Sequence, residues 1–265
     1  MLFFLESIGR ATRSLLTQTR DIFLLLSHTL FWVFVGPFKK KPVSAKGFFV
    51  QTVFSGLDSL VIVFFVDFFI GMVLAMQSAY QLEQLGAGIY VAALVGVSMT
   101  REIGPVLTAL VIAGRVGAAI TAELATMKVT EQIEALETIG LNPVRYLVAP
   151  RFLALLIMLP CLVILGDLVG IFGGYIVGVY NLGLNSSLYI DTTIQFLTTK
   201  DILTGLLKSA VFSMVITMIA CYQGLSTEGG AEGVGRSTTR SVVTSFILII
   251  VADAILTAIF YFAKT

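Results

Sequence analysis

The sequence predicts an all-α integral membrane protein with an N-terminal interfacial helix, five transmembrane helices and a short cytoplasmic helix between the second and third spans. Three observations predict this class. Hydrophobic residues make up 57% of the 265 residues and charged residues only 12%, whereas a soluble domain carries about 25% charged residues. The apolar runs reach about the twenty residues that a helix needs to cross a bilayer. They do not alternate polar with apolar positions, which favours helices over barrel strands.

Residues 1–41 form the first predicted element, an amphipathic helix in the membrane interface followed by a basic anchor. Arg10 and Arg13 are interleaved with apolar residues, and Trp32 belongs to an aromatic cluster suited to headgroup depth. The lysine run at 39–41, followed by a proline, ends the helix and favours the cytoplasmic side. Because charges come this early, we expect no cleavable signal peptide.

Five apolar runs follow within a transmembrane core over residues 42–265, and the whole chain, 1–265, is predicted to be a single domain. A proline at position 160 is expected to kink the third span. The connecting segments 114–150, 181–201 and 224–240 are more polar, and the last reads as a glycine-rich loop. The predicted spans are Leu57–Tyr80, Ile89–Ala113, Phe152–Tyr180, Ile202–Tyr222 and Val242–Phe262.

With five spans, lysine and arginine are distributed unevenly between the segments on the two sides of the membrane. With the N-terminus in the cytoplasm, the basic N-terminal region and segments 114–150 and 224–240 lie inside. The two outer loops, 81–88 and 181–201, together hold only Lys200. Cytoplasmic loops are enriched in Lys and Arg, so we predict a multi-pass protein with a cytoplasmic N-terminus.

Composition argues against several classes of function. A net charge of +1 indicates no nucleic-acid partner. Cys161 and Cys221 lie in apolar runs and are expected to pack there, and the single His28 has no companion for a metal site. The sequence holds no Gly-x-x-x-x-Gly-Lys phosphate loop and no Ser/His/Asp arrangement. We therefore expect no cofactor, no metal, no catalytic residue and no energy source within this chain.

Charged residues interrupt the apolar spans at a few positions. A charge at the bilayer centre costs about 2.5–3.5 kcal/mol on insertion scales, so such residues usually face a protein interior or a water-filled cavity. Two explanations stay open: ion pairs that hold helices together, or a pathway for a polar group. Glu102 and Lys208 are the preferred pair for a pathway, whereas Asp167 and Asp253 are expected to pair helices. The other charges in the spans are Asp58, Asp67 and Arg101.

Small residues recur at four-residue spacing in two spans. This pattern places them on one face of a helix and allows a second helix to approach closely. It is equally compatible with packing inside one chain and across a dimer. The residues are Gly166, Gly170, Gly174 and Gly178 in the third span, and Ala113, Gly117 and Thr121 from the second span onward.

Residues 121–140 read as one short amphipathic helix that is too polar to span a membrane. Val129, Ile133 and Leu136 share one face, and glutamates at 131, 134 and 137 share another. Gly140 is expected to end this helix. It is either an ordinary surface helix or a docking helix for a soluble partner.

Several longer motifs resemble the MlaE family of permeases. The Glu-Ala-Leu of the cytoplasmic helix followed by Gly140 and a later Leu-Pro is similar to the loop of ABC importer permeases. The resemblance to the MlaE family covers nearly the whole chain and is weakest over the first 50 residues. The motifs that carry it are Thr100–Val106, Ala113–Gly117, Thr121–Leu124, Thr130–Leu136, Pro150–Phe152 and Gly235–Val243.

The resemblance implies a function. MlaE-family proteins are the non-catalytic membrane subunits of ABC systems that move phospholipids or related lipids between the inner and outer membranes of Gram-negative bacteria. A homodimer in the inner membrane is implied, with two cytoplasmic ATPase subunits, often a small STAS-domain protein, and a periplasmic hexamer of MCE-domain proteins. The residues alone leave two alternatives: an ion-coupled secondary transporter, although no internal repeat is evident, and a membrane-embedded enzyme, although no catalytic arrangement is present.

The same resemblance implies which residues act. The lipid pocket is expected between the two copies, lined by the first and second spans. Lys208 is expected to attract the lipid phosphate, and Glu102 to limit how tightly Lys208 holds the lipid. By position, the substrate-binding residues are Leu74, Ser78, Leu82, Leu85, Glu102, Ile103 and Lys208. The ATPase-coupling residues are Glu131, Gln132, Ile133, Glu134, Ala135 and Leu136.

Overall fold

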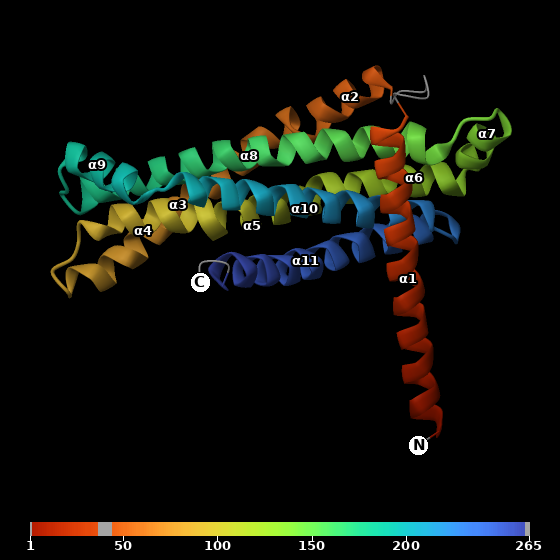
Figure 1. Cartoon of the computed structure of the whole chain (residues 1–265), viewed down its shortest axis with the longest axis horizontal. Helices are drawn as coiled ribbons and strands as arrows, with labels where there is room; N and C mark the ends of the chain where they lie inside the picture. The colour runs from red at the N-terminus through yellow and green to blue at the C-terminus, as the bar shows by residue number, and fades with distance from the viewer. Residues whose placement is uncertain (1, 37–43, 263–265) are drawn as a thin grey trace. The chain divides into compact units, whose positions relative to one another are not determined.

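The computed structural model describes residues 2–36 and 44–262, and all regular structure in these ranges is helical (Figure 1). The predicted basic anchor at 39–41 lies outside the described residues. The N-terminal segment forms a helix, α1. In chain order the helices are α1 (Leu2–Phe34), α2 (Ala45–Ser55), α3 (Leu60–Glu83), α4 (Tyr90–Ser98), α5 (Gly104–Ile112), α6 (Ala118–Val129), α7 (Gln132–Thr138), α8 (Ala149–Ile176), α9 (Ser186–Phe196), α10 (Thr199–Leu225) and α11 (Gly230–Phe262).

Five helical stretches in the described residues are long and apolar enough to cross a membrane, which confirms the five predicted spans. Every stretch is longer than predicted, because polar residues continue the helices beyond their apolar cores. Short turns join successive helices within the first two stretches: a 3₁₀ turn at Leu57–Ser59, and π-helical turns at Met99–Ile103 and Ala113–Gly117. Two further π-helical turns, Val144–Val148 and Val177–Asn181, begin and end the third stretch. The five stretches are Ala45–Glu83, Tyr90–Val129, Val144–Asn181, Thr199–Leu225 and Gly230–Phe260.

Two expectations about the polar segments are wrong. The segment 224–240 is not a loop, because α11 begins at Gly230 directly after a turn in which Gly229 and Gly230 have φ of 90° and 67°. The glycines that suggested a loop make this turn, and the polar residues after it are helical. The segment 121–140 is not one helix, because Glu131 adopts a left-handed φ of 59° and separates α6 from α7.

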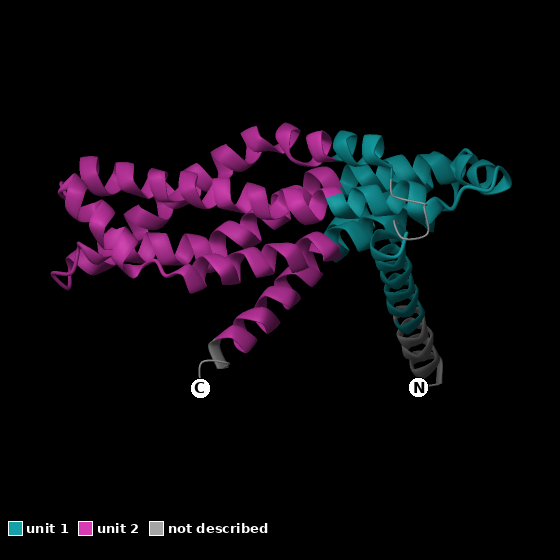
Figure 2. Cartoon of the chain, turned by 45° about the horizontal axis from the view of Figure 1, so that its top comes forward, with its two compact units in different colours: residues 1–51, 117–153, 216–244 teal, residues 52–116, 154–215, 245–265 magenta. Residues whose placement is uncertain are grey.

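The described residues fall into two compact units (Figure 2). Unit 1 comprises residues 1–51, 117–153 and 216–244, and unit 2 comprises residues 52–116, 154–215 and 245–265. Within unit 1, the Thr121 hydroxyl lies 2.8 Å from that of Ser241, and the Arg145 guanidinium lies 5.5 Å from the centre of the Trp32 ring. These contacts join α6 to α11, and the π-helical turn at Val144–Val148 to α1.

The glycine ridge of the third span packs inside unit 2. A Cβ atom on Gly71 of α3 would overlap the backbone of Gly170, and one on Gly178 would overlap the ring of Tyr189 in α9. The absence of side chains therefore lets α8 lie directly against α3. The adjoining apolar core contains Ala75, Ala79, Val91, Val95, Met99 and Val177.

The short helix within the predicted loop 181–201 is α9, which lies against α4 (Figure 1). Asn185 begins it, because its side-chain oxygen accepts hydrogen bonds from the backbone of Ser187 at 2.9 Å and Leu188 at 3.5 Å. Tyr189 is 1% exposed and holds α9 in place. Burial raises the pKa of Tyr189 to about 12.

Candidate functional site

The centre of the candidate site is a buried lysine between two carboxylates. Lys208 of α10 is only 2% exposed. Its ammonium nitrogen lies 2.5 Å from Oε2 of Glu102 and 2.8 Å from Oδ1 of Asp253, and it donates a hydrogen bond of 2.7 Å to Oγ1 of Thr257. A buried ammonium group requires such partners. The predicted pairing of Glu102 with Lys208 is present, and Asp253, expected only to pair helices, belongs to the same cluster.

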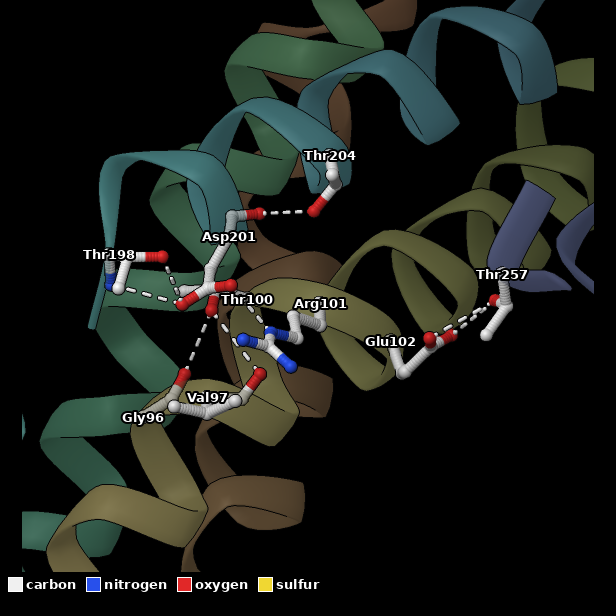
Figure 3. Close-up of polar contacts among 9 residues, drawn as sticks. All are labelled: Gly96, Val97, Thr100, Arg101, Glu102, Thr198, Asp201, Thr204 and Thr257. Carbon is white, nitrogen blue, oxygen red and sulfur yellow. Dashed lines mark hydrogen bonds and ion pairs between the residues drawn. The ribbon is translucent and has the colours of Figure 1, made fainter. Parts of the chain in front are cut away.

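A π-helical turn in the second span carries two neighbouring charged side chains that point to different helices. The turn runs from Met99 to Ile103, and such turns frequently occur at functional sites. Figure 3 shows Arg101 pointing toward Asp201 at the start of α10, while Glu102 points toward Thr257 of α11. Consecutive residues of a helix do not face the same way, so the two successive charges reach different helices.

Asp201 is a site residue that sequence reasoning missed. Its carboxylate is almost fully buried and accepts a 2.6 Å hydrogen bond from Nε of Arg101. It also accepts hydrogen bonds from the backbone nitrogen of Thr198 at 3.0 Å and from the Thr198 hydroxyl at 2.8 Å, as Figure 3 shows. A threonine followed three residues later by an acidic residue marks a helix start. That signal could have identified the beginning of α10 and the buried carboxylate.

Two hollows meet at Glu102. The first, which we call the charged cavity, has a volume of about 180 Å³. The second, the apolar groove, has a volume of about 370 Å³ and runs along α3 and the second span. The charged cavity is lined by Arg101, Glu102, Lys200, Asp201, Thr204, Lys208, Thr257 and Phe260. The apolar groove is lined by Ile70, Val73, Leu74, Gln77, Glu102, Ile103, Val106 and Leu107.

The structure brings together four of the seven predicted substrate-binding residues. Leu74 and Ile103 line the apolar groove, Lys208 lines the charged cavity, and Glu102 lines both. The other three lie elsewhere, further along the same helical face of α3 and in the turn after it. Ser78 is buried, Leu82 packs against the apolar core of unit 2, and Leu85 is 77% exposed.

The predicted coupling segment comprises Glu131 and the residues of α7 up to Leu136. Ile133 is buried and attaches α7 to its own unit, whereas the side chains of Gln132, Glu134 and Ala135 are exposed and Leu136 is half-buried. Glu131 precedes the helix in its left-handed conformation. The exposed surface of α7 is therefore polar and acidic, and Ile139 adds an exposed apolar side chain after its last turn.

An ion pair joins α7 to the end of α6. The Lys128 ammonium group donates a hydrogen bond to the Glu134 carboxylate. This contact lowers the pKa of Glu134 below its usual value. Lys128 therefore helps to orient α7 on the surface of unit 1.

The fold and the site define a class: an all-helical, multi-pass membrane protein in which a buried cluster of charges adjoins an apolar groove. The chain belongs to the MlaE permease family, because residues 48–259 match the family described as Permease MlaE. The motifs around Arg101, Arg115 and Gln132 that resembled this family lie within the matched range.

Curated relatives agree with this assignment. A probable ABC transporter permease protein of Rickettsia prowazekii is 44% identical over 92% of this chain and 93% of its own length. The intermembrane phospholipid transport system permease protein MlaE of Haemophilus influenzae is 37% identical over 97% of both chains. The chloroplastic protein trigalactosyldiacylglycerol 1 of Arabidopsis thaliana is 35% identical over 78% of this chain and 59% of its own length.

Proposed function

We propose that this chain is the membrane-spanning permease subunit of an ABC transporter that moves phospholipids between the inner and outer membranes. The observation that carries the proposal is that Glu102 lines both the charged cavity and the apolar groove. A phospholipid has the matching parts, a charged headgroup joined to apolar tails. The names of the Haemophilus and Rickettsia relatives support the same function.

The charges of the cavity suggest how a headgroup would bind. Lys208 is buried and already contacts two carboxylates, so its positive charge is largely compensated. Arg101 is 46% exposed at its side chain, and Lys200 is exposed on the same cavity. These two cations would reach a lipid phosphate first, because exposed guanidinium and ammonium groups bind phosphate oxygens strongly. Glu102 and Asp253 would keep Lys208 from holding the lipid too tightly.

The groove favours a site shared by two copies. Its wall is formed by apolar side chains of α3 and of the second span, among them Val73, which is 50% exposed. A homodimer would cover this wall and enclose the lipid tails between the copies. The permease domain would span the whole chain, 1–265, with α1 in the membrane interface and the N-terminus in the cytoplasm of an inner-membrane protein.

Energy would come from a separate ATPase subunit. The proposal assigns Glu131, Gln132, Glu134, Ala135 and Leu136 to its docking surface, with Ile133 holding α7 in place. This chain would then be the non-catalytic subunit. A periplasmic hexamer of MCE-domain proteins and a STAS-domain protein would complete the transporter.

Reconstitution tests the proposed function against its alternative, an ion-coupled secondary transporter. The chain would be purified with its bound partners from its native membrane, and the complex placed in liposomes that contain a fluorescent phospholipid. The proposal predicts that the preparation contains an ATPase and that ATP drives lipid movement. Lipid or solute movement driven by a proton or sodium gradient without ATP would support the alternative.

A further inference from the structure

Two carboxyl groups outside the candidate site are buried together in unit 2. Asp67 of α3 is 0% exposed and Asp167 of α8 is 8% exposed. Asp67 Oδ2 accepts a 3.1 Å hydrogen bond from the Thr108 hydroxyl of α5. Oδ1 of each aspartate has no hydrogen-bond partner in the described part of the chain. The two aspartates lie on neighbouring helices, because the residue before Asp167 faces the Asp67 carboxyl group.

Glycines make room for these carboxyl groups. Gly166, which directly precedes Asp167, lies against the Asp67 carboxyl group, and a Cβ atom there would overlap it. In the same way, a Cβ on Gly104 would overlap Oδ1 of Asp167. The two carboxyl groups are thus packed closely against glycine backbone of neighbouring helices.

Cations near these helices have other carboxylates as partners. Arg101 contacts Asp201, and Lys208 contacts Glu102 and Asp253. Among the described residues, no lysine or arginine forms an ion pair with Asp67 or Asp167. Two neighbouring carboxylates without a cation are costly in a buried environment, because each charge loses its hydration and repels the other. Protonation removes both penalties.

We propose that Asp67 and Asp167 form a proton-binding site inside the membrane-spanning part of the chain, with at least one of the two carboxyl groups protonated at neutral pH. The Thr108 hydroxyl stabilises the Asp67 carboxyl group, and the proton allows α3 and α8 to stay in contact at their glycines. Loss of the proton would place two like charges between these helices. Close packing of α3 on α8 is therefore linked to proton binding.

Infrared spectroscopy of the full chain in lipid nanodiscs, with its aspartate side chains labelled with ¹³C, tests this proposal directly. We expect a carbonyl band of a protonated aspartic acid at neutral pH, identified by its isotope shift. Asp67→Asn and Asp167→Asn together should remove the band. The matched control, Asp253→Asn, should retain it, because Asp253 lies outside this pair and contacts Lys208 instead. If the unmutated chain shows no labelled acid band at neutral pH, the proposal is overturned, whatever the variants show.

Thermal unfolding separates a proton from a metal cation as the ligand. In neutral buffer the double asparagine variant should unfold at about the temperature of the original chain, because an amide replaces a neutral acid of similar shape. In alkaline buffer the original chain should lose more stability than the variant. Saturable stabilisation by sodium or calcium that the double variant lacks would instead identify a cation site and overturn the proposal.

Discussion

The ammonium nitrogen of Lys208 lies 2.5 Å from Oε2 of Glu102, although the two residues are 106 positions apart in the chain. The contact joins the second span to the fourth, and Asp253 extends it to the fifth at 2.8 Å. One ammonium group therefore contacts carboxyl groups from two different spans.

Removing the buried cation is expected to destabilise the fold. Lys208→Met would leave Glu102 and Asp253 as neighbouring unpaired charges. Breaking a buried ion pair costs about 3–5 kcal/mol, and we expect about 3 kcal/mol because Glu102 is partly exposed. Thermal unfolding in nanodiscs measures the change. Lys200→Met in the same helix is the control and should change stability by about 0.5 kcal/mol or less. Equal stability of the two variants would show that the cluster does not hold the spans together.

The exposed cations of the charged cavity are expected to control headgroup binding. Arg101→Gln with Lys200→Gln removes the two positive charges that a phosphate would meet first. Each charge-assisted hydrogen bond contributes about 1.5–3 kcal/mol, so phospholipid affinity should fall at least about tenfold. Quantification of phospholipid that co-purifies in detergent measures the effect. Thr257→Val, which leaves both of these cations in place, is the comparison. Unchanged lipid content in the double variant would assign the headgroup to another surface.

The docking surface of α7 is expected to be sensitive to charge and to bulk. Glu134→Lys or Leu136→Asp should abolish stimulation of the ATPase while the chain stays inserted in the membrane. Lys128→Ala is the control for the ion pair, because it removes the partner of Glu134 but keeps the acidic surface. Co-purification of the ATPase and its ATP hydrolysis rate are the measurements. If both survive Glu134→Lys and Leu136→Asp, the ATPase docks elsewhere.

The ion pair of α7 also predicts a dependence on pH. Because Lys128 lowers the pKa of Glu134, the contact is fully present above the ordinary carboxyl pKa and is lost as pH falls through the lowered value. Lys128→Ala should move the pKa of Glu134 upward, toward its ordinary range. Titration of the Glu134 carboxyl carbon by NMR measures this. An unchanged pKa in the variant would show that the pair does not form in solution.

The contact of α3 with α8 depends on a glycine. Gly71→Leu would drive a side chain into the backbone of Gly170. Overpacking of this kind costs about 1–3 kcal/mol, which a lower unfolding temperature would show. Gly235→Ala is the matched control, since a Cβ there meets open space and alanine favours the helical backbone by about 0.5–1 kcal/mol. A Gly71→Leu variant as stable as the original chain would contradict the close approach of the two helices.

Apolar run length and charge placement predicted much of this fold. The five spans could be counted from the sequence because each contains about twenty apolar residues, and the Glu102–Lys208 pair was anticipated because buried charges in membranes require partners. The ends of the helices were not predictable in this way. Polar residues after Gly230 and before Val129 continue helices, and hydropathy does not indicate whether a polar segment is helical.

The parts of the site that depend on local backbone conformation could not be predicted from the sequence either. Arg101 and Glu102 lie in the π-helical turn at Met99–Ile103, and no residue pattern in the sequence marks such a turn. The break before α7 depends on Glu131 adopting a positive φ, which is uncommon outside glycine. Family resemblance selected Leu74, Ser78 and Ile103 alike. Tertiary packing then decides that Ser78 is buried while Leu74 and Ile103 line the groove.

Light-induced crosslinking most directly tests the claim that the apolar groove and charged cavity hold a phospholipid during transport. A photoreactive amino acid would replace Leu74 or Ile103 in the groove, or Phe172, an exposed apolar residue of α8 that does not line it. The measurement is the yield of phospholipid crosslinks with the ATPase bound, before and after ATP is added. The account predicts that the yield at Leu74 and Ile103 changes severalfold with ATP while that at Phe172 does not. Equal yields at all three positions, unaffected by ATP, would mean that the groove contacts only bulk membrane lipid and would contradict the account.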